Sequence, residues 1–173
     1  PELTKAVEAL LEYDGPAYLR LGRPAVETVT DEIPGYSFAL GKGCTLRGGS
    51  DATVIATGMM VQMALKAAEQ LQAEGISLRV IDMPTIKPLD EALVLQAAQE
   101  TGVIVTSEEH SVIGGLGAAV AEYLSENYPV PVIRHGVEDC FGRSGTAAAV
   151  LAHYGLTPEV LCQKVKLALS KKR

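Results

Sequence analysis

Apolar positions along most of the chain alternate between two periods. Short aliphatic and β-branched runs predict buried strands, and runs with apolar residues three and four positions apart predict helices between them. Glycines at the ends of the helical runs indicate where those helices stop. The expected strands are 53–57, 77–81, 103–105 and 130–135, and the expected helices are 60–74, 89–101, a glycine-led segment within 114–127, 146–153 and one that begins at Thr157.

This alternation predicts the fold class. Strands separated by single helices form a parallel sheet with helices on both faces. A further extended segment, 38–46, is joined to the 53–57 strand by a short turn at 47–51, so the two are expected to pair as antiparallel neighbours. The sequence thus predicts an α/β protein: a three-layer open mixed sheet of five strands, four parallel and one antiparallel at the edge.

The first 25 residues do not fit this unit. A helix over 3–11 and a short strand over 17–21 cannot bury their own apolar faces, so they need a second sheet. Residues 26–35 have no strong period and are interpreted as a linker. The expected organisation is a terminal piece of another domain (1–25), a linker (26–35) and one α/β domain (36–173).

Composition and charge narrow the function classes. Of 173 residues, 47% are hydrophobic and 21% charged, as in globular chains, and the net charge of −6 argues against a nucleic-acid partner. No apolar run approaches the roughly 20 residues of a membrane span, so no membrane partner is expected. Three distant cysteines indicate reduced thiols in a cytoplasmic protein, without the spacing of a metal site.

The densest group of candidate functional residues follows the 103–105 strand. A polar turn is expected at 107–110, and Gly114, Gly115 and Gly117 lead into a helix. Glycines before a helix can cradle phosphate, but Val120 stands where the dinucleotide fingerprint needs glycine, so close helix packing is favoured. Glu108, Glu109 and His110 could work as acids and bases, or could cap the helix or meet a partner subunit.

Two arginines, Arg20 and Arg23, lie at the end of the 17–21 strand. Guanidinium groups bind phosphate in a bidentate manner, although two exposed arginines can equally be solvated surface charge. His135 and His153 are expected to be structural. Neither a nucleophile elbow nor a set of metal ligands is visible, so no catalytic residue is assigned.

The chain resembles the C-terminal part of transketolase and related thiamine-diphosphate enzymes, especially the form split over two polypeptides. The likeness rests on four segments, DATVIATGMMVQMALKAAEQL, ISLRVIDMPTIKPLD, VIVTSEEHSVIGGLGAAVAEYL and VPVIRHGVEDCFGRSGTAAAVLAHYGLTPEVL. The segment LTKAVEALLEYDGPAYLRLGRP is similar to the last helix and strand of the family's pyrimidine-binding domain.

The resemblance implies a parent enzyme of the pentose phosphate pathway that moves a two-carbon ketol unit between phosphorylated sugars, using thiamine diphosphate and a divalent metal such as magnesium. Arg23, and less directly Arg20, would bind the substrate's phosphate. The family's cofactor motifs are missing from these residues, so the piece is expected to be a truncated fragment that starts at Pro1, binds no cofactor and is inactive alone. It would assemble with an N-terminal transketolase subunit or domain and within a homodimer, with Glu109, His110, Gly114 and Gly115 as the hypothetical contact with the partner.

Two alternatives remain from the sequence. One is a related enzyme, a 1-deoxyxylulose-5-phosphate synthase or the β subunit of a 2-oxoacid dehydrogenase. The other is a non-enzymatic regulatory domain that binds a small anion at the glycine-flanked corner.

Overall fold

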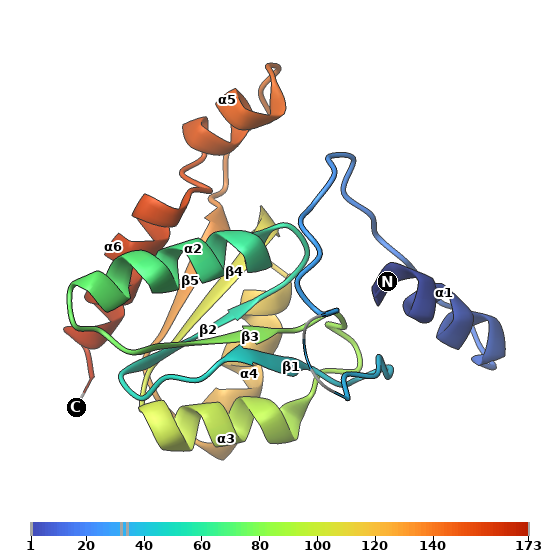
Figure 1. Cartoon of the computed structure of the whole chain (residues 1–173), viewed down its shortest axis with the longest axis horizontal. Helices are drawn as coiled ribbons and strands as arrows, with labels where there is room; N and C mark the ends of the chain where they lie inside the picture. Colours follow the sequence, from blue (N-terminus) through green and yellow to red (C-terminus); the bar gives the residue numbers. More distant parts are fainter. Residues whose placement is uncertain (1, 32, 34, 173) are drawn as a thin grey trace.

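A computed structural model describes residues 2–31, 33 and 35–172. Pro1, the expected start of the fragment, and Pro34, within the expected linker, lie outside the described residues. The sheet has five strands, and Figure 1 shows it between two layers of helices, with one helix standing apart at the top of the view and another at the right. The strands are β1 (Cys44–Arg47), β2 (Ala52–Ala56), β3 (Leu78–Asp82), β4 (Ile104–Ser111) and β5 (Val132–Val137). The helices are α1 (Glu2–Glu12), α2 (Met60–Ala73), α3 (Glu91–Thr101), α4 (Leu116–Asn127), α5 (Ala147–His153) and α6 (Pro158–Leu169).

The strand order is β1-β3-β2-β4-β5, with β2, β3, β4 and β5 parallel and β1 antiparallel at one edge. The predicted fold class is therefore confirmed. The predicted hairpin is wrong, because β1 pairs with β3 and not with β2. All five residues of β2 are buried, and its two sides are taken by the parallel neighbours β3 and β4.

Each face of the sheet has its own apolar core. On one face, β2, β3 and β4 pack against α2 and α6 through Val54, Val80, Leu71 and Leu161. On the other face, Ile55, Ile81 and Ile104 pack against α3 and α4. Abundant alanine on α2 and α3 lets these helices lie close to the sheet, which fits a core with few aromatic side chains.

Local signals explain several helix boundaries. The Thr157 hydroxyl accepts a hydrogen bond from the Val160 amide, and Pro158 occupies the first turn of α6, as the sequence predicts. The Asp90 carboxylate caps α3 in the same way by accepting from the Leu93 amide. Gly102 ends α3 in a left-handed conformation, with φ of 69°.

Two expectations about strands are wrong. Residues 17–21 form no strand, because among the described residues no neighbouring strand is available to pair with them. The 103–105 strand does not end in a polar turn at 107–110. It continues as β4 to Ser111, because its buried polar residues find partners inside the domain.

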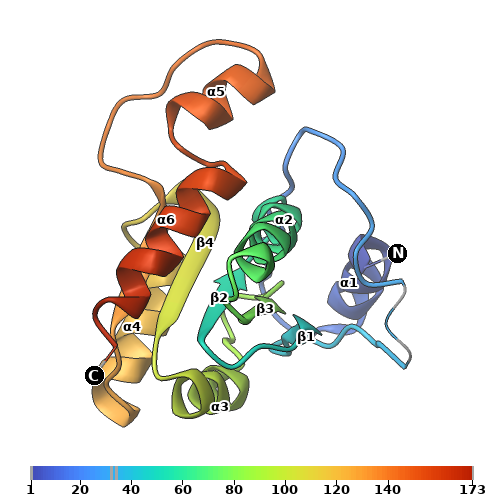
Figure 2. The ribbon, with the colours of Figure 1, turned by 60° about the vertical axis from the view of Figure 1, so that its left-hand side comes forward.

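Helix α1 is amphipathic as expected, but much of its apolar side faces solvent. Leu3, Val7 and Leu11 are 47%, 41% and 82% exposed, and Ala6 is the buried residue of this helix. In both views α1 lies outside the three layers (Figures 1 and 2). The first element therefore contributes little to the core of the α/β domain.

Candidate functional site

Glu108 is the central residue where β4 meets α4. Its side chain is 1% exposed, and its two carboxylate oxygens accept hydrogen bonds from the amides of Leu116 and Gly117, each at 2.8 Å. Those amides belong to the first turn of α4, where helix N–H groups lack partners and the helix dipole favours negative charge. The chain's own carboxylate thus holds the position at which a helix start would otherwise bind an anion.

The glycines around this carboxylate explain how it fits. Gly114 has φ of 74°, a conformation that side chains disfavour, and it turns the chain from β4 toward α4. A Cβ atom on Gly115 would collide with the Glu108 carboxylate, and one on Gly117 would lie 2.7 Å from the Thr106 hydroxyl. The glycines permit close approach of the strand's own side chains to the helix start, which is the close packing favoured by the sequence.

Glu109 and His110 follow this buried joint, with Glu109 half-buried and His110 exposed. His110 is 46% exposed, and its Nδ1 lies 2.9 Å from the Ser111 carbonyl and 3.9 Å from the Glu108 carboxylate. The Arg20 guanidinium donates a hydrogen bond of 3.1 Å to the Glu109 carbonyl. Two of the regions singled out in the sequence, 89 residues apart, therefore lie side by side at the carboxyl end of β4. Arg23 is exposed on the same N-terminal segment.

His135 is a buried link between three segments. Its Nε2 lies 2.8 Å from the Gly155 carbonyl, so Nε2 carries the proton, and Nδ1 accepts from the Ser107 hydroxyl at 2.9 Å. Burial lowers the pKa of His135 below its ordinary value, opposed in part by the bond to Gly155. Through these two hydrogen bonds the neutral ring of His135 on β5 connects β4 and the turn before α6. This agrees with the structural role expected for His135.

A buried carboxylate at the end of β3 was not predicted from the sequence. Asp82 is 3% exposed, and burial raises its pKa to about 8, with further contributions from the charge of Glu2 and a hydrogen bond to it. The Tyr36 hydroxyl also donates a hydrogen bond to Glu2. These contacts attach the first turn of α1 to the carboxyl end of β3. The contact joins Asp82 of β3 to Glu2 of α1, which are far apart in the sequence, so no local sequence pattern could have predicted it.

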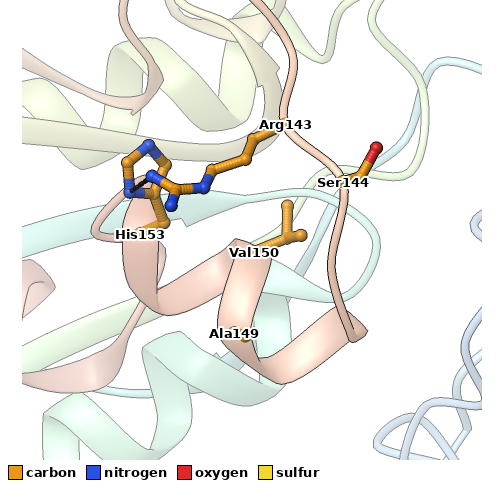
Figure 3. Close-up of a pocket in the computed structure, with 5 residues that line it drawn as sticks. All are labelled: Arg143, Ser144, Ala149, Val150 and His153. Carbon is orange, nitrogen blue, oxygen red and sulfur yellow. Dashed lines mark hydrogen bonds between the residues drawn. The ribbon is translucent and has the colours of Figure 1, made fainter.

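Residues of α5 and of the segment just before it line a cavity of about 330 Å³ (Figure 3). The Arg143 guanidinium donates to Nδ1 of His153 at 3.3 Å, which leaves the arginine as the cationic group of the cavity. Figure 3 shows the Ser144 hydroxyl pointing away from this pair. The polar groups do not converge on a common point, so the cavity does not form an anion site.

The glycine-led start of α4 does not fit the diphosphate of thiamine diphosphate. The start of α4, the helix that follows the glycines, already carries the Glu108 carboxylate, which would repel a diphosphate. Within the described part of the chain, no three His, Cys, Asp or Glu side chains gather in a way that could hold a metal ion. No chemical step is therefore assigned to groups of this chain.

Comparisons with known proteins identify the fold. A family profile described as "Transketolase, C-terminal domain" matches residues 41–161. The chain belongs to the transketolase C-terminal domain family. A solved structure described as "Split gene transketolase, inactive beta4 tetramer" superimposes with a TM-score of 0.92 and 49% identity, covering 98% of this chain and 55% of that one.

Curated relatives of this transketolase domain include subunits of transketolases. The "6-deoxy-6-sulfo-D-fructose transketolase subunit SqwH" of Clostridium sp. (strain MSTE9) is 49% identical over 90% of this chain and 48% of its own length. A subunit of the apulose-4-phosphate transketolase of Phocaeicola vulgatus is 47% identical over 97% of this chain and 53% of its own. A "1-deoxy-D-xylulose-5-phosphate synthase" of Heliobacterium modesticaldum is 40% identical over 90% of this chain and 24% of its own. The chain thus spans about half the length of the first two relatives.

The longest described helix of this transketolase domain is α2, with 14 residues. None of the helices within residues 2–31, 33 and 35–172 combines the length and the apolar character of a membrane span.

Proposed function

We propose that this chain supplies the C-terminal part of a split transketolase. The parent enzyme would transfer a two-carbon ketol unit between phosphorylated sugars; thiamine diphosphate would supply the electron sink for that chemistry, and a divalent metal such as magnesium would be its second cofactor. The observation that carries the proposal is the joint likeness to proteins named as transketolase subunits, at 49% and 47% identity over at least 90% of this chain. The cellular site of this enzyme is proposed to be the cytoplasm.

The contacts of the described residues suggest which tasks of the parent enzyme belong to this chain and which belong to its other parts. Because Glu108 fills the start of α4, we assign the cofactor and metal to parts of the parent that this chain does not contain. Residues 1–25 are proposed to complete the neighbouring domain, which is supported by the exposed apolar side chains of Leu3, Val7 and Leu11. The chain alone is then expected to be inactive.

Substrate binding is proposed for the arginines of the N-terminal segment. Arg23 would bind the phosphate of the sugar, and Arg20 is the second candidate. Support comes from the exposure of both side chains and from the bond of Arg20 to the Glu109 carbonyl, which holds this segment at the carboxyl end of β4. Ligands of open α/β sheets bind at that end of the strands.

Assembly is the proposed task of the α/β domain. We propose that it joins an N-terminal transketolase subunit and that copies of the chain associate within the parent dimer. One supporting fact is that a relative of 49% identity is described as a beta4 tetramer. The surface at Glu109, His110 and Gly114, with the buried Gly115 beneath it, is proposed to meet the partner subunit, because His110 is exposed there and the buried Glu108 keeps the underlying turn in place.

The test uses this chain together with its N-terminal partner. A coupled assay with xylulose and ribose phosphates should give turnover for the assembled enzyme and none for the chain alone. Arg23→Ala should raise KM for the phosphorylated substrate by roughly 10-fold or more, since a charge-assisted contact of about 1.5–3 kcal/mol is lost. Turnover by the isolated chain, or unchanged KM in Arg23→Ala, would contradict this proposal.

A matched pair of variants tests the assembly surface. Glu109→Ala and His110→Ala should weaken subunit association in the full enzyme while leaving the stability of the isolated chain within about 0.5 kcal/mol, as is usual for surface substitutions. Unchanged association and unchanged activity in both variants would remove the assembly role of this surface.

A second candidate is a 1-deoxyxylulose-5-phosphate synthase, favoured by relatives of that name at 40% and 39% identity. The same assembled enzyme would then condense pyruvate with an aldose phosphate and would not use xylulose phosphate as a ketol donor. Because two transketolase relatives are named for sulfofructose and apulose phosphate, the assay should include ketoses beyond those of the pentose phosphate pathway.

A further inference from the structure

Residues 138–154, which we call the arm, run from the end of β5 through α5. The twelve residues from 138 to 149 are all exposed, and no side chain of α5 is fully buried, although Leu151 and Tyr154 pack against the core. Figures 1 and 2 both show α5 standing away from the three layers of the domain. Phe141 is 99% exposed, the largest exposure among the large apolar side chains of the described residues. A fully exposed phenylalanine forgoes the burial that usually stabilises such a side chain.

The arm nevertheless has a defined internal structure. The Tyr154 hydroxyl donates a 2.8 Å hydrogen bond to the Phe141 carbonyl, and Arg143 donates to His153 at 3.3 Å. The Thr146 hydroxyl caps α5 by accepting from the Ala149 amide. A helix of seven residues is not stable in water by itself, so these bonds to flanking residues maintain it. These hydrogen bonds order the backbone around Phe141 while its side chain remains exposed, as expected of a surface that contacts another protein.

The sequence around Phe141 is complementary to itself in charge. Asp139 lies two residues before Phe141, and Arg143 lies two residues after it. When two copies of such a segment meet antiparallel across a two-fold axis, residues at equal distances from the centre oppose one another. Phe141 would then contact its counterpart, and the Asp139 carboxylate of each copy would face the Arg143 guanidinium of the other. The hydrogen-bond partner of Arg143 is an imidazole and not a carboxylate, so the guanidinium charge is available for this pairing.

We infer that the arm is the surface through which two copies of this chain associate, with Phe141 at the two-fold axis and two reciprocal Asp139–Arg143 pairs beside it. This inference rests on the proposed association of copies and adds the residues that mediate it. We assign the contact to a second copy of the chain because Asp139 and Arg143 lie at equal distances on either side of Phe141. Two antiparallel copies of this segment therefore bring opposite charges together, which binding to an unrelated protein would not require.

The experiment is sedimentation velocity on this chain over a range of concentrations. Phe141→Asp should raise the dissociation constant between copies at least about tenfold, the lower range for a buried phenylalanine. Asp139→Arg and Arg143→Asp should each weaken association, because each places like charges opposite one another. The double variant with both changes restores opposite charges in each pair, and its dissociation constant should return to within about threefold of the original. Tyr18→Asp, at an aromatic residue 89% exposed outside the arm, is the matched control and should change nothing.

The outcomes separate this inference from the proposed function. If the unmodified chain is monomeric at every concentration, the proposed association of copies fails, and the arm contact fails with it. If the chain associates but Phe141→Asp associates equally well, only the arm is excluded. A charge-swapped double variant as weak as its parents, or an arm variant that loses the N-terminal partner and not the second copy, also overturns the arm as a contact between copies.

Discussion

Replacing Glu108 by glutamine tests the joint between β4 and α4 most directly. The carboxylate accepts one amide hydrogen bond on each oxygen, and the side chain is 1% exposed. Glutamine keeps the size of the side chain but offers one acceptor oxygen, and its NH₂ group must face an amide donor. One buried N–H is left without a partner, which costs about 1–3 kcal/mol. Loss of the negative charge at the helix start adds about 1 kcal/mol.

The expected decrease in the free energy of unfolding is therefore about 2–4 kcal/mol. With a urea m-value near 2 kcal/mol/M, this corresponds to a midpoint lower by roughly 1–2 M. Urea unfolding of the chain, followed by circular dichroism, measures both quantities. The m-value should stay constant, because the change affects one joint and not the surface exposed on unfolding. Alanine at this position leaves both amides without the carboxylate and should cost more.

Glu109→Gln provides a matched control at the next residue. The Glu109 side chain is half-buried and, unlike that of Glu108, accepts no hydrogen bond from the start of α4; its backbone carbonyl accepts from Arg20, which the substitution keeps. Its free energy of unfolding should remain within the range of ordinary surface changes, about 0.5 kcal/mol. A Glu108→Gln variant no less stable than Glu109→Gln would refute the role assigned to the carboxylate.

Two further variants probe neighbouring features. Gly115→Ala should lower the free energy of unfolding by about 1–3 kcal/mol, because its Cβ meets the buried Glu108 carboxylate, whereas Gly48→Ala, with open space around the new methyl, should have little effect in the same urea titration. For His135, the lowered pKa means that the unfolded chain binds more protons than the folded chain below the ordinary pKa of 6.5. The free energy of unfolding should therefore decrease as the pH is lowered through that range, by at most about 1.4 kcal/mol per pH unit. His135→Gln should lose this contribution, and parallel pH profiles of the two proteins between about pH 7.5 and 5 would contradict the buried neutral ring.

The order of helices and strands could be predicted from the sequence because residues that favour helix starts, helix ends or buried strands stand at the expected positions. Thr157 and Pro158 favour a helix start through capping and a fixed φ, and Gly102 ends a helix by adopting a left-handed conformation. Buried strands such as β2 consist of aliphatic and β-branched residues that suit a sheet covered on both faces. These local preferences agree with the final packing, so the fold class followed from them.

The pairing of β1 could not be predicted from the short connection at 47–51. A short connection permits a hairpin but does not require one, and here the chain passes over the beginning of β3. Gly49 lies so close to the backbone of Leu78 and Arg79 that a side chain has no room. β1 is only partly buried, which suits an edge, while the fully buried β2 needs a neighbour on each side.

The polar end of β4 was misjudged for a related reason. Polar residues usually indicate a turn, but side chains alternate along a strand, and Ile104, Thr106 and Glu108 share the face that α4 covers. Counting every second residue from Ile104 would have placed Glu108 against the glycines that start α4. Its two amide partners, eight and nine residues later, come within reach only once the helix is folded back.

The placement of β1 outside β3 has a consequence for how the sheet is built during synthesis. β1 leaves the ribosome before β2, α2 and β3, yet its hydrogen-bonding partner is β3, the last of these to emerge. It must wait unpaired until that strand has docked, since a distant contact forms only after the intervening loop is closed. The residues before Cys44 are therefore joined to the sheet through β1, the strand that is synthesised first but pairs only after β3 is in place.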